Sequence, residues 1–361
     1  MAEDQKVRIS GFLVFFLIHA IQVGVGILGF QRLIVKSAGN DAWIAVIFAG
    51  ITTSVIIWFM YGLLKNEKNK DLNGIHRKLF GKWFGGLLNL IWVLYWLMLG
   101  LTIIRSYIEV VSVWMFPHIN VIVFSFILLL LVYYGISGGF RVVAGICFLG
   151  VVIPFYLALT FLFPIEYTNF RNLLPVWNHS INEMAIATKD MGLSYLGFST
   201  LLMYYPYIKH PEKSQKWAQL GNILTTLVYM FLIIISICYF SEGQLDEHIW
   251  ATLSMWKIVE MPIVERFEYV GITSWVLVIL PNISLAVWAA LKVASGTFKI
   301  KEKKILIFMM VFLYVGCIFI EGKEKIDQLS NLVTFSGLLL VYLYVPCLLL
   351  YSKLMSKIRR N

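Results

Sequence analysis

Two short glycine-rich stretches could bind a small ligand through backbone groups rather than side chains. Residues 24–29 read GVGILG and residues 192–197 read GLSYLG, so both follow the pattern G-x-(G/S)-x-L-G inside apolar segments. Each Gly costs a helix interior about 1 kcal/mol relative to Ala, which makes local unwinding easy. Unwinding frees N–H groups that suit a carboxylate and carbonyl oxygens that suit an ammonium group. The pattern therefore indicates a site that holds an amino acid mainly through the backbone.

Helix packing is the alternative explanation for each stretch. Small residues at spacings near four let membrane helices approach closely, and such patterns are common. For either stretch alone, packing is the simpler interpretation. Two matching stretches that begin 168 residues apart favour a pair of interrupted helices instead.

The elements that carry these stretches are membrane spans. The chain is 60% hydrophobic and only 14% charged, which leaves too little charge to cover a water-soluble domain of 361 residues. A helix needs roughly 20 apolar residues to cross a hydrocarbon layer about 30 Å thick. The sequence therefore predicts an all-α polytopic membrane protein that forms a single domain over residues 1–361. Its ten predicted spans are 9–36, 41–64, 83–113, 119–136, 142–163, 187–208, 217–240, 269–294, 304–321 and 331–352.

The two glycine-rich stretches occupy the first and the sixth predicted span. Five spans separate them, so the second copy enters the membrane from the opposite side. This spacing predicts an inverted repeat of five plus five helices, about 9–163 and 187–352, with discontinuous helices 1 and 6 in a LeuT-like arrangement. The ligand site is expected near mid-membrane, between the two interruptions.

The distribution of Lys and Arg predicts that both termini are cytoplasmic. With that orientation, 21 of the 30 basic residues lie on the cytoplasmic side and eight outside, while Arg105 lies within a span. This bias follows the positive-inside rule. It also explains the net charge of +10 without a nucleic-acid partner.

Two outer segments and the cysteines carry further expectations. Residues 164–186 are expected to form a loop, and residues 243–267 are expected to form an amphipathic helix at the membrane surface. Cys147, Cys238, Cys317 and Cys347 all lie in apolar runs. That placement favours buried apolar side chains over disulfides or metal ligands.

Several polar residues lie inside the spans. Arg105 and Glu109 are one helical turn apart, and an ionisable residue at this depth is a functional hypothesis by default. The alternative is that they pair with each other, or that Arg105 reaches outward. His19 and Gln22 are interpreted as interhelical hydrogen-bonding groups, with a proton relay as the alternative.

Other candidates would complete the wall of the site. Tyr95 and Leu99 share one helix face and would contact a ligand or simply pack in the core. Pro281 would kink the eighth span, so that Asn282 and Ser284 present polar groups to the cavity, although a kink alone is the alternative. The fifth span, residues 142–163, has no ionisable side chain and so no evident proton-coupling group.

These stretches resemble the B subunits of GerA-type spore germinant receptors, the spore germination permeases of the amino acid–polyamine–organocation superfamily. The matching passages are GVGILG at 24–29, AGNDAW at 38–43, GLSYLGF at 192–198 and YPYIK at 205–209. The likeness extends over essentially the whole chain. One departure is Phe30-Gln31-Arg32, where the family usually has a proline before the arginine.

The resemblance implies a membrane subunit that binds a small nutrient germinant, often an amino acid. It also implies partnership with A and C subunits in the spore inner membrane. A stand-alone secondary amino acid transporter and a ligand-gated ion pathway formed by oligomers are the competing hypotheses. The sequence supplies no motif for an enzyme, a cofactor or a metal site. The predicted ligand-binding residues are Gly24, Val25, Gly26, Ile27, Tyr95, Leu99, Gly197, Phe198, Ser199, Asn282 and Ser284.

Overall fold

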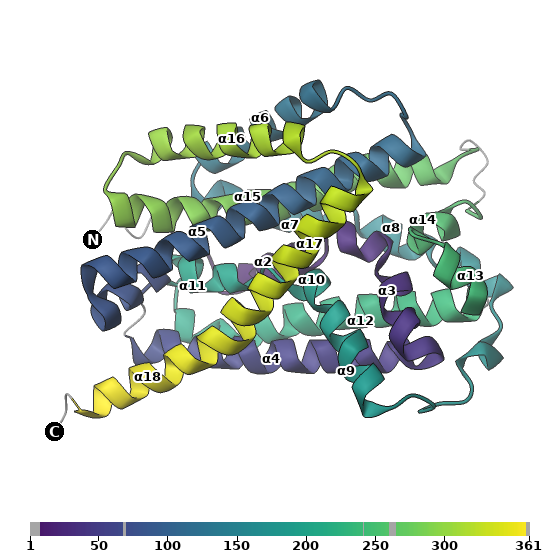
Figure 1. The fold of residues 1–361 in the computed structure, drawn as a ribbon, viewed down its shortest axis with the longest axis horizontal. Helices are drawn as coiled ribbons and strands as arrows, with labels where there is room; N and C mark the ends of the chain where they lie inside the picture. Colours follow the sequence, from purple (N-terminus) through teal and green to yellow (C-terminus); the bar gives the residue numbers. More distant parts are fainter. Residues whose placement is uncertain (1–7, 68–69, 241, 260–264, 359–361) are drawn as a thin grey trace.

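The computed structural model describes residues 8–67, 70–240, 242–259 and 265–358, which form an all-helical bundle (Figure 1). The α-helices are α2 (Leu13–Gln22), α3 (Phe30–Ala38), α4 (Ala42–Asn66), α5 (Leu72–Trp114), α6 (Val121–Ser137), α7 (Phe140–Val152), α8 (Phe155–Thr160), α9 (Ile181–Asp190), α10 (Gly192–Tyr195), α11 (Leu201–Tyr204), α12 (Gln215–Tyr239), α13 (Glu242–Glu247), α14 (Ala251–Trp256), α15 (Phe267–Phe298), α16 (Glu302–Phe319), α17 (Lys323–Gly337) and α18 (Val345–Ile358). Short 3₁₀ segments connect several of them, and a π-helix, η8 (Leu338–Tyr344), joins α17 to α18.

Several helical stretches are long and apolar enough to cross a membrane. Among the described residues there are six: Phe30–Asn66, Leu72–Trp114, Phe140–Tyr167, Pro211–Tyr239, Phe267–Phe298 and Lys323–Ile358. Two shorter apolar helices are α2 and α6. All ten predicted spans are helical over most of their length, which confirms the all-α prediction. The number of crossings stays a prediction.

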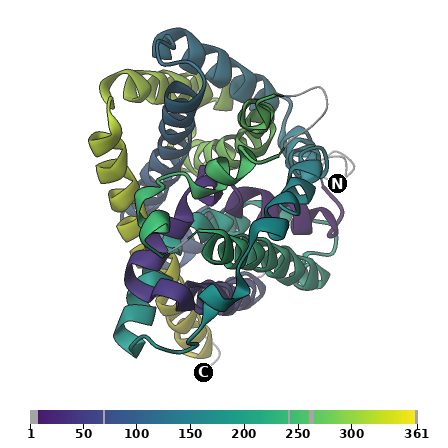
Figure 2. The same ribbon diagram turned by 90° about the vertical axis from the view of Figure 1, so that its right-hand side faces the viewer.

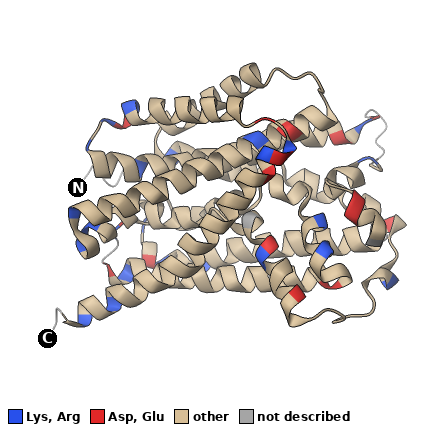
Figure 3. Ribbon diagram, viewed as in Figure 1, with Lys and Arg blue, Asp and Glu red and all other residues tan. Residues whose placement is uncertain are grey.

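The surface of the bundle suits lipid. Large apolar side chains such as Trp58, Phe126, Phe308 and Leu350 are exposed along the helix sides. Figure 3 shows that Lys, Arg, Asp and Glu gather mainly toward the helix ends. Continuous apolar faces of this extent mark a membrane surface, so the chain is a multi-pass membrane protein.

The first helix is interrupted within the bundle. Helix α2 ends at Gln22, the 3₁₀ segment η1 covers Val25–Leu28, and α3 begins at Phe30. Most of α2 is buried, and the end-on view in Figure 2 shows this N-terminal purple segment passing through the middle of the bundle.

A second interruption follows α10. Gly197 has φ 105°, a left-handed conformation that favours glycine, and the 3₁₀ segment η5 (Phe198–Thr200) follows it. Both glycine-rich stretches therefore interrupt a helix, as predicted.

Helix α5 folds back on itself at Gly81, which has φ 77°. The stretch before Gly81 lies against the stretch after it, where His76 Nδ1 is 2.6 Å from Asn89 Oδ1. Asn89 also donates to Asn73 (2.7 Å) and to Thr297 of α15 (3.0 Å). Because Asn73, His76 and Asn89 are buried and bonded to one another, they tie the two halves of α5 together at this end of the bundle.

The segment 164–186 is a loop with two 3₁₀ turns, as predicted, but α9 begins within it at Ile181. Ser180 caps α9 in a reciprocal capping box with Glu183. Hydrogen bonds from the backbone N–H and hydroxyl of Ser180 hold the pKa of the Glu183 carboxyl below its ordinary value.

The prediction of one amphipathic surface helix over 243–267 is wrong for the described residues, and residues 260–264 lie outside them. The segment forms two short helices, α13 and α14, and Leu253 and Trp256 of α14 are fully buried. Apolar side chains here pack against α12 and α15 rather than lipid, a difference that an amphipathic pattern does not encode.

The prediction of burial holds for three cysteines and is wrong for Cys347, which is exposed. A helix that faces lipid is apolar on its outer side, so an apolar neighbourhood in sequence does not imply burial.

Candidate ligand-binding site between two interrupted helices

The two interruptions contact each other. A side chain added at Gly26 would place its Cβ 2.8 Å from Ser194 Oγ of the second stretch. A Cβ added at Gly197 would lie 2.5 Å from Cγ1 of Ile21, near the end of α2. Glycine at both positions therefore allows the close approach of the two interruptions. The tertiary structure thus brings together the two motifs that the sequence separates.

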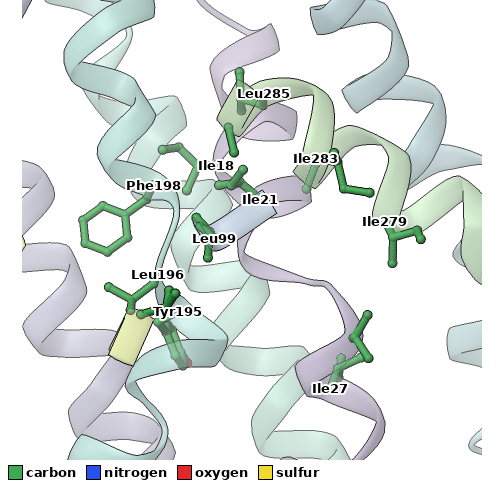
Figure 4. Packing of buried hydrophobic residues seen from close by; sticks show 14 of the residues in the cluster. Ile18, Ile21, Ile27, Leu99, Tyr195, Leu196, Phe198, Ile279, Ile283 and Leu285 are labelled. Carbon is green, nitrogen blue, oxygen red and sulfur yellow. The ribbon is translucent and has the colours of Figure 1, made fainter. Parts of the chain in front are cut away.

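A cavity of about 570 Å³ lies beside this contact. Its floor includes Gly24, Val25 and Gly26 of the first interruption and Ser194 and Leu196 of the second. Figure 4 shows Leu99, Leu196 and Ile21, which line this cavity, on three separate elements. The volume falls within the range of small-molecule pockets.

The cavity extends toward the end of the bundle opposite the Asn89 cluster. Its mouth carries charged residues of both signs: Arg32, Lys36, Glu109, Asp190, Lys323 and Asp327. Lys323 Nζ and Asp327 Oδ1 are 3.4 Å apart. Formal charge is thus concentrated at the mouth, while the floor is built from backbone and neutral side chains.

The first interruption offers unused hydrogen-bond donors at the cavity floor. The first N–H groups of a helical segment have no partner within it. Among the described residues, the backbone N–H groups of Gly24, Val25 and Gly26 donate to no residue outside η1. Three successive N–H groups at a helix N-terminus suit an anionic group such as a carboxylate.

Side chains from distant helices donate to the carbonyl groups at the end of α2 and in the first interruption. Asn282 Nδ2 donates to the carbonyls of Ala20, Ile21 and Val23. Tyr229 donates to Gln22 O at 3.0 Å, Trp275 to Gly24 O at 3.2 Å and Thr252 to Ile27 O at 2.8 Å. Side-chain donors therefore already occupy these carbonyls, which leaves the N–H groups as the main groups that the first interruption offers to a ligand.

Five of the predicted site residues line the cavity: Gly24, Val25, Gly26, Leu99 and Asn282. Ile27 lies on a second cavity of about 260 Å³, together with Val23 and Trp275. In Figure 4, Ile27 is correspondingly apart from Leu99 and Leu196. Its contact with a ligand stays a prediction.

The other five predicted residues lie away from the 570 Å³ cavity. Ser199 accepts a hydrogen bond from Trp96 (3.1 Å), and Phe198 packs edge-on against Tyr342. Gly197 contacts Ile21, and the buried hydroxyl of Tyr95 lies near Gly337 of α17. Ser284 faces Gly135 of α6 rather than the cavity. Helix rotation decides these orientations, and their role in binding stays a prediction.

The sequence analysis missed several residues that line the cavity. Ser194 and Leu196 belong to the second glycine-rich stretch, so that motif was the available signal. Gln22 was interpreted only as an interhelical group. Tyr229 and Trp250 come from α12 and the segment before α14, and no sequence feature marks them.

The interhelical interpretation of His19 and Gln22 is confirmed. His19 Nδ1 lies 2.9 Å from Thr225 Oγ1, and Gln22 donates to Asn222 at 3.0 Å. Both partners are on α12, so these groups tie α2 to α12.

The two alternatives to a functional role for Arg105, a pair with Glu109 or a side chain that reaches outward, are both wrong. Arg105 is 3% exposed, and its Nε and Nη1 have no hydrogen-bond partner among the described residues. It therefore neither pairs with Glu109 nor reaches outward. Glu109 instead lines the cavity mouth. Positions i and i+4 allow contact but do not enforce it, because each side chain follows its own helix–helix interface.

Comparison with known proteins gives the family. A model of the spore germination protein family matches residues 8–326. Spore germination protein GerQB of Bacillus cereus is 44% identical over 353 residues, which cover 98% of each chain. Spore germination protein A2 of Bacillus subtilis (strain 168) is 21% identical over 364 residues, covering 97% of each chain.

Among solved structures, the chain is similar to a Na⁺-coupled sialic acid symporter in a substrate-bound outward-open state. The TM-score is 0.65 at 14% identity, over 92% of this chain and 77% of that chain. This likeness gives the fold, which is LeuT-like. The family itself is shown by the match over residues 8–326 and by the 44% identity to GerQB: the chain belongs to the spore germination protein family.

Proposed function

We propose that this chain is the B subunit of a spore nutrient germinant receptor, which binds an amino acid near mid-membrane and triggers germination. The observation that carries this proposal is the set of unused N–H groups at Gly24, Val25 and Gly26 on the floor of a cavity. They suit the ligand's carboxylate. Gln22 Oε1 and Asn282 Oδ1 are buried acceptors that have no hydrogen-bond partner within the described part of the chain; both side chains line the same cavity, and these oxygens suit the ligand's ammonium group.

The proposal also covers the partner subunits, the membrane and the topology of this chain. It acts with A and C subunits in the spore inner membrane, with both termini cytoplasmic. Ten spans form two inverted repeats of five, and the cavity opens to the outer side. The similarity to GerQB over nearly the whole length supports the receptor assignment.

The direct test is Gly26→Val. Its side chain would fill ligand space and meet Ser194, so we expect ligand affinity to fall at least ~10-fold, a loss of about 1.4 kcal/mol. The measurements are a germination dose–response for each of the twenty amino acids and the amount of subunit in the spore membrane. Gly145→Val on α7 is the matched control, because a Cβ at Gly145 meets nothing within 4 Å.

Two outcomes contradict the proposal. If Gly26→Val protein is absent from the membrane while Gly145→Val protein is present, the glycine serves packing. If Gly26→Val protein is present with an unchanged dose–response, the ligand binds elsewhere.

A stand-alone amino acid transporter is the second candidate function, and the fold shared with a symporter favours it. Uptake of labelled amino acids by vesicles that contain this chain alone separates the two. Saturable uptake supports transport, whereas binding without uptake supports the receptor.

A further inference from the structure

The end of α2 gathers carbonyl oxygens around one side-chain nitrogen. Asn282 Nδ2 lies 2.9 Å from the carbonyl oxygen of Ala20, 3.1 Å from that of Ile21 and 3.2 Å from that of Val23. These carbonyls are at the C-terminal end of a helix, which is the negative end of its dipole. Because α2 stops at Gln22, no following turn supplies N–H groups for all of them.

In transporters with discontinuous helices, unwound carbonyls and half-helix C-termini bind the coupling cation. Here a neutral amide occupies that position. Its orientation follows from the chemistry of its neighbours. All three are carbonyl oxygens that can only accept, so the NH₂ end of Asn282 must face them.

The neighbouring carbonyls are satisfied in the same way. Tyr229 donates to Gln22 O and Trp275 donates to Gly24 O. The five successive carbonyls from residue 20 to residue 24 thus all accept from neutral side-chain donors on α12 and α15. The adjacent ionisable side chain, His19, is turned to Thr225.

We infer that Asn282 is a built-in replacement for a coupling cation, so that the first interruption keeps its shape and binds its ligand without Na⁺. The amide nitrogen donates hydrogen bonds to the carbonyl oxygens that would otherwise coordinate a cation. The amide oxygen is buried, has no hydrogen-bond partner among the residues that the structure describes, and belongs to a side chain that lines the cavity. If the cavity binds an amino acid, as proposed above, this oxygen is an acceptor for its ammonium group.

The first test uses Na⁺ alone, so its result is independent of whether the cavity binds an amino acid. The thermal midpoint of the purified chain in detergent is measured in sodium chloride and in choline chloride at equal ionic strength. The wild type should give the same midpoint in both salts. A midpoint that rises and saturates with Na⁺ in the wild type overturns the inference.

The second test replaces the Asn282 donor, so that the three carbonyl oxygens can coordinate Na⁺. In Asn282→Asp, a carboxylate replaces the donor beside three carbonyls, so the midpoint should fall in choline and rise with Na⁺ until it saturates. Asn282→Ser, whose shorter side chain leaves room beside the carbonyls, repeats the test with a neutral residue if the Asp variant does not fold.

Asn222→Asp is the matched control, since this buried amide donates to one carbonyl, that of Gly50, and to Ser54. It should show no Na⁺ response. If a folded Asn282 variant shows none either, these carbonyls do not form a cation cage and the inference fails.

Discussion

Leu99 is the buried apolar side chain through which α5 lines the cavity, so we expect it to influence which ligand fits. It is 3% exposed and lines the cavity beside Leu196. Leu99→Ala enlarges the cavity, so we expect the preference to shift toward larger amino acids by roughly 10-fold or more in response midpoint. The measurement is the dose–response across amino acids of different size.

The matched control for Leu99 is Leu101→Ala on the same helix. Leu101 is 2% exposed and contacts Gly316 of α16 rather than the cavity. It should lower stability without changing the order of preferred amino acids. If both variants change the order alike, the effect belongs to α5 packing and not to the site.

Arg105 gives a second prediction at the scale of one residue. Because two of its nitrogens are buried and have no partner in the described segments, Arg105→Met should leave the free energy of unfolding unchanged or raise it by about 1–3 kcal/mol. Glu109→Gln should change it by less than about 0.5 kcal/mol. Denaturation of the purified variants measures both. A large loss in Arg105→Met would reveal a partner that holds the guanidinium.

At the scale of elements, Asp41 joins the two interrupted helices outside the cavity. Its carboxylate, at the turn between α3 and α4, accepts from the backbone N–H groups of Trp177 (2.7 Å), Asn178 (2.7 Å) and His179 (3.2 Å). His179 Nδ1 is also 3.0 Å from it. The loop that precedes α9, and with it the start of α9, is thereby fixed to the end of α3.

We expect Asp41→Ala to release this loop. The free energy of unfolding should fall because the hydrogen bonds to the carboxylate are lost. The fall should be only about 1–2 kcal/mol, since the freed N–H groups can bond to water instead. Trypsin cleavage at Arg171 should become faster. Asp327→Ala is the control, since an exposed ion pair contributes about 0–1 kcal/mol. Equal protection of Arg171 in Asp41→Ala and wild type would refute the role of this carboxylate.

At the scale of the whole molecule, both ends of the described chain lie at the same end of the bundle (Figure 1). The 21-to-8 distribution of basic residues predicts that this end is cytoplasmic. A reporter fused after Arg360 and one inserted near Lys257 should therefore report opposite sides of the membrane. Labelling on the same side would mean that the spans are miscounted.

Local sequence alone determined which segments are helical and where two of them stop. Long apolar runs form helices because lipid offers no other partner for backbone groups, and this holds whatever the neighbours are. Three glycines within residues 24–29 interrupt the first helix for an equally local reason. The sequence also predicted that Asn282 would take part in a polar contact, because an amide beside a proline within a span needs a polar partner.

Only the tertiary structure decided which way each helix faces. An apolar side chain is as suitable against lipid as against protein, so the sequence could not distinguish exposed Cys347 from buried Cys147. The partners of the freed carbonyls also depend on packing, since Tyr229 and Trp275 lie more than 200 residues from the carbonyls they bind. Hydrogen bonds between distant segments are set by the rotation and crossing of whole helices, and no local pattern encodes these.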